Sequence, residues 1–136
     1  MSRKIKNYDL NQGKYVARPT SETVGHPVIF SLQHIQAGKF CFSILDHKKK
    51  GDFADALYRR KDFTWNNLYQ NDHKKLGVEP LPADRIKASK PTFMTEDVDK
   101  YEVIRFSKED GRVVGFRKSN VFYILWIDCK FKLYNH

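Results

Sequence analysis

Three apolar runs, rich in β-branched and aromatic residues, fill the last part of the chain from Tyr101 to His136. Two short polar turns, at residues 107–111 and 118–120, separate these runs. Such a pattern is typical of an antiparallel three-stranded meander. The last run is apolar at successive positions over 121–127, so we expect it to be a central strand that is covered on both faces.

Two further alternating segments, residues 28–35 and 40–45, flank a turn at 36–39 that contains Gly38. Apolar side chains occupy every second position on one face of each segment. This pattern predicts an N-terminal β-hairpin.

The spacing of apolar residues between these two regions is helical. Asp52 is predicted to cap a first helix, which leaves the basic run at 47–50 as a solvated connection before it. A second helix is predicted to begin at Thr64, because Thr64 can cap it and Phe63 and Leu68 have the spacing of a hydrophobic staple. We expect these two short helices to form a hairpin.

The predicted elements define an α+β fold: a mainly antiparallel sheet, made of the C-terminal three-stranded meander and the N-terminal hairpin, with two short helices packed on one face. The 136 residues fit a single domain, 1–136. Residues 1–25 are basic and poor in apolar positions. They are expected to form an arm that lies on a phosphate backbone, covers a sheet edge, or frays as an ordinary terminus.

Charge is the strongest compositional signal. The net charge is +9 and the pI is near 9.6, which favours nucleic acid, an acidic protein, or both as partners; a generally basic surface without a specific partner is the alternative. No apolar run is long enough to span a membrane, and no apolar leader follows Met1, so a cytoplasmic location without membrane association is expected.

Several chemistries have no support in the sequence. There is no glycine-rich phosphate loop, no HExxH and no nucleophile-elbow serine, so neither a metal nor a small-molecule cofactor is predicted. Cys41 and Cys129 do not form a CxxC pair, and we expect them to be reduced and packed.

The predicted C-terminal sheet carries the better candidates. Arg105, Arg112 and Arg117 offer the planar, permanently charged guanidinium that suits phosphate. Strand residues alternate between faces, so Arg112 and Arg117 fall on opposite faces unless a bulge intervenes. Tyr134 and His136 are able to transfer protons. Their alternatives are an aromatic ring that packs at the sheet rim and a chain end that frays.

The segments GRVVGF and VFYILWIDCKFKLYNH follow a helical hairpin and a basic group at 73–75, and this arrangement resembles the RelE/ParE toxin superfamily. The resemblance is to its RelE and YoeB branch and covers about residues 50–136. It implies that Arg112 binds phosphate, that Lys74 and Lys75 contact RNA, and that Tyr134 and His136 transfer protons. Further RNA-binding candidates, chosen for charge and position, are His73, Arg105 and Arg117.

The resemblance implies a toxin of a toxin–antitoxin system, a metal-independent endoribonuclease that cleaves messenger RNA on the ribosome and is neutralised by a small acidic antitoxin. Two alternatives stay open. One is a toxin of this fold that lacks RNase activity and binds gyrase or another protein. The other is a non-catalytic, basic nucleic-acid-binding protein of a phage or mobile element. The glutamate base of the YoeB branch has no match in this sequence, so no general base is assigned.

Overall fold

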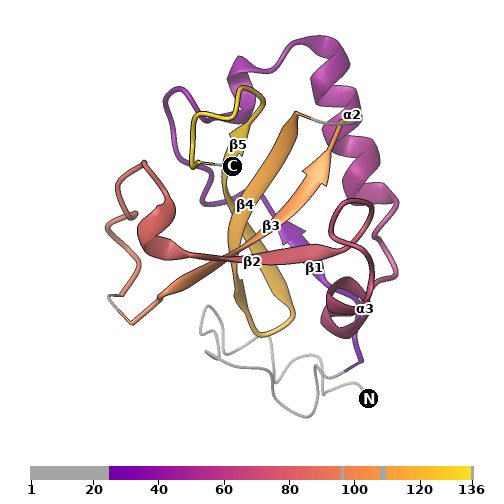
Figure 1. Cartoon of the computed structure of the whole chain (residues 1–136). Helices are drawn as coiled ribbons and strands as arrows, with labels where there is room; N and C mark the ends of the chain where they lie inside the picture. The colour runs from indigo at the N-terminus through magenta and orange to yellow at the C-terminus, as the bar shows by residue number, and fades with distance from the viewer. Residues whose placement is uncertain (1–24, 96, 108–109, 136) are drawn as a thin grey trace, which may run out of the picture.

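The computed structural model describes residues 25–95, 97–107 and 110–135. In this part of the chain five strands form one sheet in the order β1-β5-β4-β3-β2, and two helices complete the fold (Figure 1). The predicted α+β class is therefore confirmed. The elements are β1 (Ile29–Ser31), η1 (Phe42–Ile44), α2 (His47–Tyr58), α3 (Trp65–Gln70), β2 (Val78–Pro82), η2 (Ala83–Arg85), β3 (Lys100–Phe106), β4 (Gly111–Lys118) and β5 (Val121–Asp128), where η marks a 3-10 helix.

The antiparallel part of the sheet has four strands rather than the predicted three. β2 pairs with β3, β3 with β4, and β4 with β5, each in the antiparallel sense. The additional strand, β2, contains Pro80 and Pro82, and prolines are usually found outside strands. The prolines are tolerated because β2 is an edge strand, and a proline there can turn the side that lacks an N–H group toward solvent.

The predicted N-terminal hairpin is wrong. β1 pairs with β5 in the parallel sense, with Ile29 opposite Val121. The second alternating segment contains the 3-10 helix η1 instead of a strand. Just before η1, the Phe40 carbonyl accepts a hydrogen bond from the Ile127 N–H (2.8 Å). An irregular segment therefore supplies a hydrogen-bond partner to the β5 backbone beyond the end of β1. Alternation indicates an extended backbone, but it does not indicate the strand with which that backbone pairs.

α2 begins earlier than predicted. Its cap is Asp46, whose carboxylate accepts a hydrogen bond from the Lys49 N–H (2.8 Å). The basic run at 47–50 is therefore the first turn of the helix and not a connection before it. Asp52, the predicted cap, lies within the helix, where it pairs with Lys48 at 3.1 Å.

α3 begins where the sequence predicted. The Thr64 hydroxyl accepts from the Asn67 N–H (3.1 Å), and the Asn67 side chain accepts from the Thr64 N–H (2.9 Å). This reciprocal pair satisfies two of the N–H groups that a helix start leaves without partners.

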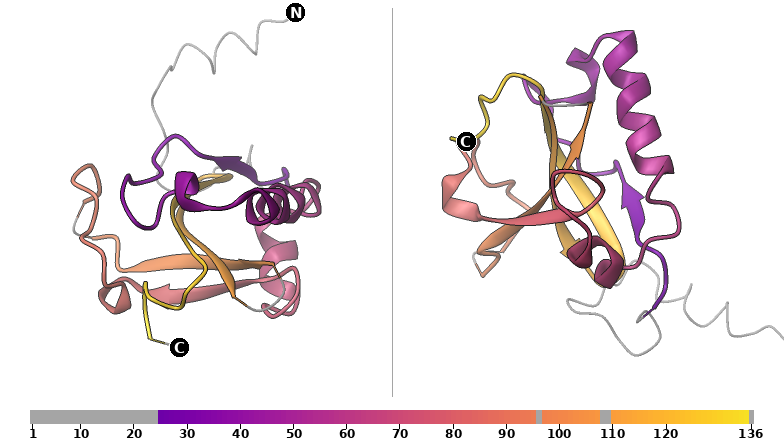
Figure 2. Two further views of the ribbon diagram at one scale, coloured as in Figure 1. Left: turned by 90° about the horizontal axis from the view of Figure 1, so that it is seen from above. Right: turned by 45° about the vertical axis from the view of Figure 1, so that its right-hand side comes forward.

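The sheet has a hydrophobic cluster on each face. The helices cover one face, called here the helix face, and residues 83–95, 97–99 and 130–135 cover the other, called the loop face. Figure 2 shows α2 and the C-terminal residues on opposite sides of the sheet. β5 is buried on both faces as predicted, although the central strand is β4. Helix-face members include Phe53, Leu68, Ile104, Val113 and Phe122. Loop-face members include Tyr101, Val103, Val114, Trp126 and Tyr134.

A bulge in β5 interrupts the register. Val114 faces Trp126 and Gly115 faces Ile124, so Leu125 is the extra residue. Because the extra residue lies in β5, the alternation along β4 continues without a break.

No helix in the described ranges is long and apolar enough to cross a bilayer.

Candidate nucleic-acid interface

Two of the three arginines predicted for the site, Arg105 and Arg112, lie directly opposite each other on neighbouring strands. The register of β3 and β4 places Arg105 directly opposite Arg112, and that of β4 and β5 places Arg112 opposite Asp128. Arg105 is in phase with Val103 and Arg112 with Val114, both members of the loop-face cluster. Like charges directly opposite one another destabilise an antiparallel pair. An anion bound between the two guanidinium groups would remove that repulsion.

Arg105 has unused hydrogen-bonding capacity. Its side chain is partly buried, and its Nε is buried without a hydrogen-bond partner. Among the described residues, no carboxylate lies within ion-pair distance of its guanidinium. A buried donor without a partner is uncommon in folded proteins, and an incoming acceptor such as a phosphate oxygen would satisfy it.

Arg112 is held more tightly. It is only 6 % exposed, and one of its guanidinium nitrogens donates to the Gly111 carbonyl at 3.1 Å. The Phe131 ring lies over the guanidinium, 5.5 Å from its central carbon to the ring centroid. These contacts hold the charge in a fixed position on the sheet, as preorganised electrostatic stabilisation requires.

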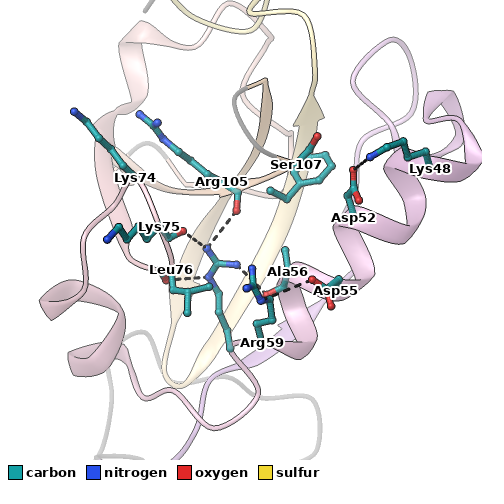
Figure 3. A pocket seen from close by; sticks show the side chains of 12 residues that line it. Lys48, Asp52, Asp55, Ala56, Arg59, Lys74, Lys75, Leu76, Arg105 and Ser107 are labelled. Atoms are coloured by element: carbon teal, nitrogen blue, oxygen red, sulfur yellow. Dashed lines mark hydrogen bonds and ion pairs between the residues drawn. The ribbon is translucent and has the colours of Figure 1, made fainter.

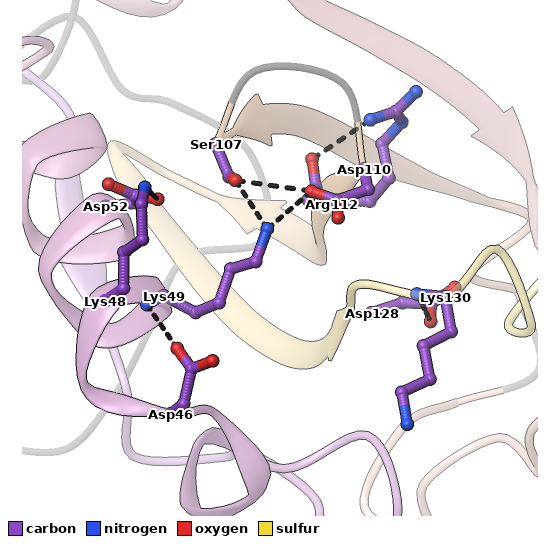
Figure 4. A network of polar contacts seen from close by, with 10 residues as sticks. Asp46, Lys48, Lys49, Asp52, Ser107, Asp110, Arg112, Asp128 and Lys130 are labelled. Atoms are coloured by element: carbon purple, nitrogen blue, oxygen red, sulfur yellow. Dashed lines mark hydrogen bonds and ion pairs between the residues drawn. The ribbon is translucent and has the colours of Figure 1, made fainter.

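The turn that joins β3 to β4 is tied to the start of α2. Lys49 Nζ donates to Ser107 Oγ (2.7 Å) and pairs with Asp110 (2.7 Å), as Figure 4 shows. The hydrogen bond between Lys49 and Asp110 raises the pKa of Lys49 and lowers the pKa of Asp110. The strand ends that carry Arg105 and Arg112 are therefore anchored to the helix.

Tyr134 lies beside the two arginines. It is 6 % exposed and belongs to the loop-face cluster. Burial raises the pKa of its phenol above the ordinary value, while the nearby Arg112 opposes this shift and Glu79 adds to it. The phenol is thus protonated at neutral pH and able to act as a proton donor.

Glu79 is a residue that sequence reasoning missed. It lies on β2 opposite Val103, and its Oε1 is 3.9 Å from His73 Nε2. The predicted RNA-binding His73 and this carboxylate thus form a pair close enough to Tyr134 for Glu79 to affect its pKa. If β2 had been predicted as a strand, its alternation would have placed Glu79 on the same face as Leu81. The two prolines of β2 are untypical of a strand, so the sequence did not predict one there.

A basic cleft of about 550 Å³ opens between α2, the turn at 71–77 and the end of β3 (Figure 3). Both of its acidic side chains form ion pairs with basic neighbours, Asp52 with Lys48 at 3.1 Å and Asp55 with Arg59 at 3.8 Å. Lys74, Lys75 and Arg105 have no ion-pair partner in the described part of the chain. Figure 3 shows Lys74 and Arg105 extending in the same direction. The charged side chains that line the cleft are Lys48, Asp52, Asp55, Arg59, Arg60, Lys74, Lys75 and Arg105.

Arg60 fixes the position of the turn at 71–77, called here the basic turn because it carries Lys74 and Lys75. It is 1 % exposed, and its guanidinium donates to four backbone carbonyls rather than to a carboxylate. Burial lowers its pKa to about 10, so it stays charged at neutral pH. The accepting carbonyls belong to Ala56 (2.9 Å), Leu76 (3.0 Å), Lys75 (3.1 Å) and Arg105 (3.2 Å).

Replacing Arg60 by methionine is expected to lower the free energy of unfolding by about 2–3 kcal/mol, because the carbonyls of the basic turn would lose their donors inside the protein. Urea unfolding would measure this loss. Arg59→Met is the matched control: the Arg59 side chain is 61 % exposed and makes only one 3.8 Å ion pair, so its loss should cost about 0.5 kcal/mol or less. Equal effects of the two substitutions would contradict a clamping role for Arg60.

Arg117 does not join this group. Its guanidinium stacks over Trp65 (4.9 Å) and Tyr69 (5.9 Å), both residues of α3, so it lies on the helix face. Tyr69 donates to Glu102 at 2.9 Å, and burial raises the pKa of that carboxyl. The opposite-face placement of Arg112 and Arg117 agrees with the alternation, and the bulge in β5 does not change it.

The remaining predicted site residues either line the cleft or lie outside the part of the chain that the structure describes. Lys74 and Lys75 are brought together with Arg105 in the cleft. His136 lies outside the described residues, as does the predicted basic arm except for Gly25. Residues 25–95, 97–107 and 110–135 contain no group of three or more His, Cys, Asp or Glu side chains that could hold a metal ion.

No protein-family model, curated protein or solved structure matches the chain. The residues themselves therefore define what the site can do. It offers two opposed guanidinium groups, a protonated phenol, a carboxylate with an imidazole neighbour, and a basic cleft beside them.

Proposed function

We propose that this protein is a toxin that cleaves messenger RNA, a metal-independent endoribonuclease that acts on the ribosome. The observation that carries the proposal is the pair of opposed arginines, Arg105 and Arg112, beside the buried and protonated Tyr134. The resemblance to the RelE/ParE superfamily in the C-terminal segment supports the same function.

In the proposed reaction, the ribose 2′-oxygen attacks the adjacent phosphorus, and the bond from phosphorus to the 5′-oxygen breaks. Glu79, assisted by His73, accepts the 2′-hydroxyl proton, and Tyr134 donates a proton to the leaving 5′-oxygen. Arg105 and Arg112 stabilise the negative charge of the pentavalent intermediate. The products are a 2′,3′-cyclic phosphate and a 5′-hydroxyl, so no external oxidant or metal is needed.

The basic cleft would hold neighbouring phosphates of the same RNA strand through Lys74 and Lys75. A small acidic antitoxin is the partner we propose for this surface, because its carboxylates would compete with RNA for the same cations. In this proposal the protein acts in the cytoplasm, where its ribosomal target lies.

A non-catalytic, basic nucleic-acid-binding protein is the second candidate. The low exposure of Arg112 and Tyr134, 6 % each, favours it, because both side chains would have to become accessible for chemistry. Inducible expression in bacteria with mapping of RNA 5′ ends separates the candidates. Growth arrest with codon-phased cuts supports the endoribonuclease, arrest with intact RNA indicates a protein target such as gyrase, and growth without arrest favours the second candidate.

RNA binding is expected to weaken steeply with salt. For single-stranded RNA each phosphate contact should contribute about 0.7 to the slope of log affinity against log salt concentration. Lys74→Ala and Lys75→Ala should each reduce the slope by about that amount. The matched control is Lys61→Ala, since Lys61 lies outside the cleft and pairs with Asp62 at 2.9 Å. A slope unchanged by the two cleft substitutions would place RNA elsewhere on the protein.

A further inference from the structure

Phe131 has an unusual backbone conformation. Its φ angle is +57°, in the left-handed region that residues with bulky side chains rarely adopt. The residue is also 45 % exposed, although both Leu133 and Tyr134 beyond it are buried. The positive φ angle is unfavourable to the folded state, and residues strained in this way cluster at functional sites. The exposure of the ring makes it accessible to a ligand.

The surrounding loop maintains this conformation. The Asp128 carboxylate accepts hydrogen bonds from three backbone N–H groups, those of Lys130 (3.0 Å), Lys132 (2.8 Å) and Leu133 (2.9 Å). Figure 4 shows Asp128 next to Lys130 at the end of β5. Because these donors flank Phe131 on both sides, the residue between them is fixed in its strained geometry.

The ring lies next to the opposed arginines. Its centroid is 5.5 Å from the central carbon of the Arg112 guanidinium, and Arg105 is the next residue of the same cross-strand row. A cation beneath one face of an aromatic ring holds the ring in place through a cation–π interaction. The exposed part of the ring then remains available to a planar apolar ligand group beside the position proposed for the phosphate.

We propose that Phe131 is a stacking platform for one unpaired nucleobase of a single-stranded RNA. The proposal rests on the proposed function, because the phosphate of the same nucleotide would lie on Arg105 and Arg112. Every base has a π face, so stacking on an aromatic side chain tolerates any sequence and contributes strongly to single-strand binding. The bases of an RNA duplex are stacked on one another and cannot reach such a ring, so single-stranded RNA is the expected ligand class.

The decisive variant is Phe131→Gly. Glycine adopts a positive φ without strain, so the melting temperature should stay the same or rise. The affinity for a single-stranded 2′-O-methyl oligonucleotide, which lacks the attacking hydroxyl, should fall roughly 5- to 100-fold. Phe131→Trp should retain the affinity. The matched control is Phe93→Gly: Phe93 is likewise 45 % exposed, but it packs on His34 and Phe116, at the other end of β4 from Arg112.

Replacing single nucleotides of the oligonucleotide by abasic ones locates the stacked base. In the wild type, one position should lose affinity to the same extent as Phe131→Gly, and the combined change should add no further loss. Wild-type protein that binds no RNA would overturn the proposed function and this inference with it. If the wild type binds RNA and Phe131→Gly binds it equally well, the stacking role alone is overturned. A large fall in the melting temperature of Phe131→Gly would also overturn the stacking role alone.

Discussion

Replacing Tyr134 by phenylalanine is expected to lower the rate of RNA cleavage roughly 10²- to 10⁴-fold, the usual contribution of a positioned general acid. The substitution removes only the hydroxyl and keeps the ring in the loop-face cluster, so the protein should still fold. Cleavage of a short RNA under single-turnover conditions would measure the loss. The ribosome should be present if free RNA is not cut.

The pH dependence of cleavage tests the same role. Burial holds the pKa of Tyr134 above its ordinary value, so the phenol keeps its proton through neutral and mildly alkaline pH. Because the acid is lost when the phenol ionises, the rate should fall only as the pH rises through that raised pKa. Tyr134→Phe should abolish this alkaline limb as well as lower the rate.

Tyr101→Phe is the matched control. Tyr101 is also buried in the loop-face cluster, and burial raises its pKa too, but it packs edge-on against Trp126 rather than beside Arg112. Its loss of a hydroxyl should leave cleavage unchanged. If the two variants cleave equally well, Tyr134 is not the proton donor. Deleting the chain from Tyr134 onward would be a poorer test, because it removes a buried ring from the core.

Much of the fold follows from local chemistry that a sequence shows directly. The polar turns between apolar runs predict three strands of the antiparallel sheet, and Thr64 with its neighbours predicts the start of α3. The start of α2 was misplaced because Asp46 and Asp52 are both chemically able to cap, and only the fold decides between them. β2 was missed because its two prolines indicate a break, although an edge strand tolerates them.

The candidate site was less predictable, because it depends on register and backbone angles. Alternation places Arg112 and Arg117 on opposite faces, but it does not reveal that Arg105 lies directly opposite Arg112. That pairing depends on the length of the turn between the strands. Glu79 belongs to the missed strand, and the left-handed conformation of Phe131 has no sequence signal, since glycine is the residue that usually marks such a position.

Substituting either arginine of the opposed pair by glutamine is expected to lower cleavage roughly 10²-fold or more, because each guanidinium stabilises charge that develops on the phosphate. Arg105→Gln should also weaken RNA binding, since Arg105 is the more exposed of the two. The double variant should lose much less than the product of the two single losses, because groups that act on one phosphate do not contribute independently. Melting temperatures of all three variants would separate lost chemistry from lost folding, which matters most for the buried Arg112.

Arg117→Gln provides the matched control for this experiment. It removes the same charge from the same strand but from the helix face, where the guanidinium stacks over Trp65 and Tyr69. RNA cleavage by this variant, in folded protein, should equal that of the wild type. Cleavage that survives the loss of both Arg105 and Arg112 but fails with Arg117→Gln would move the site to the helix face, where the buried Glu102 has a raised pKa. Losses that multiply in the Arg105 and Arg112 double variant would show that the two arginines do not act on a common phosphate.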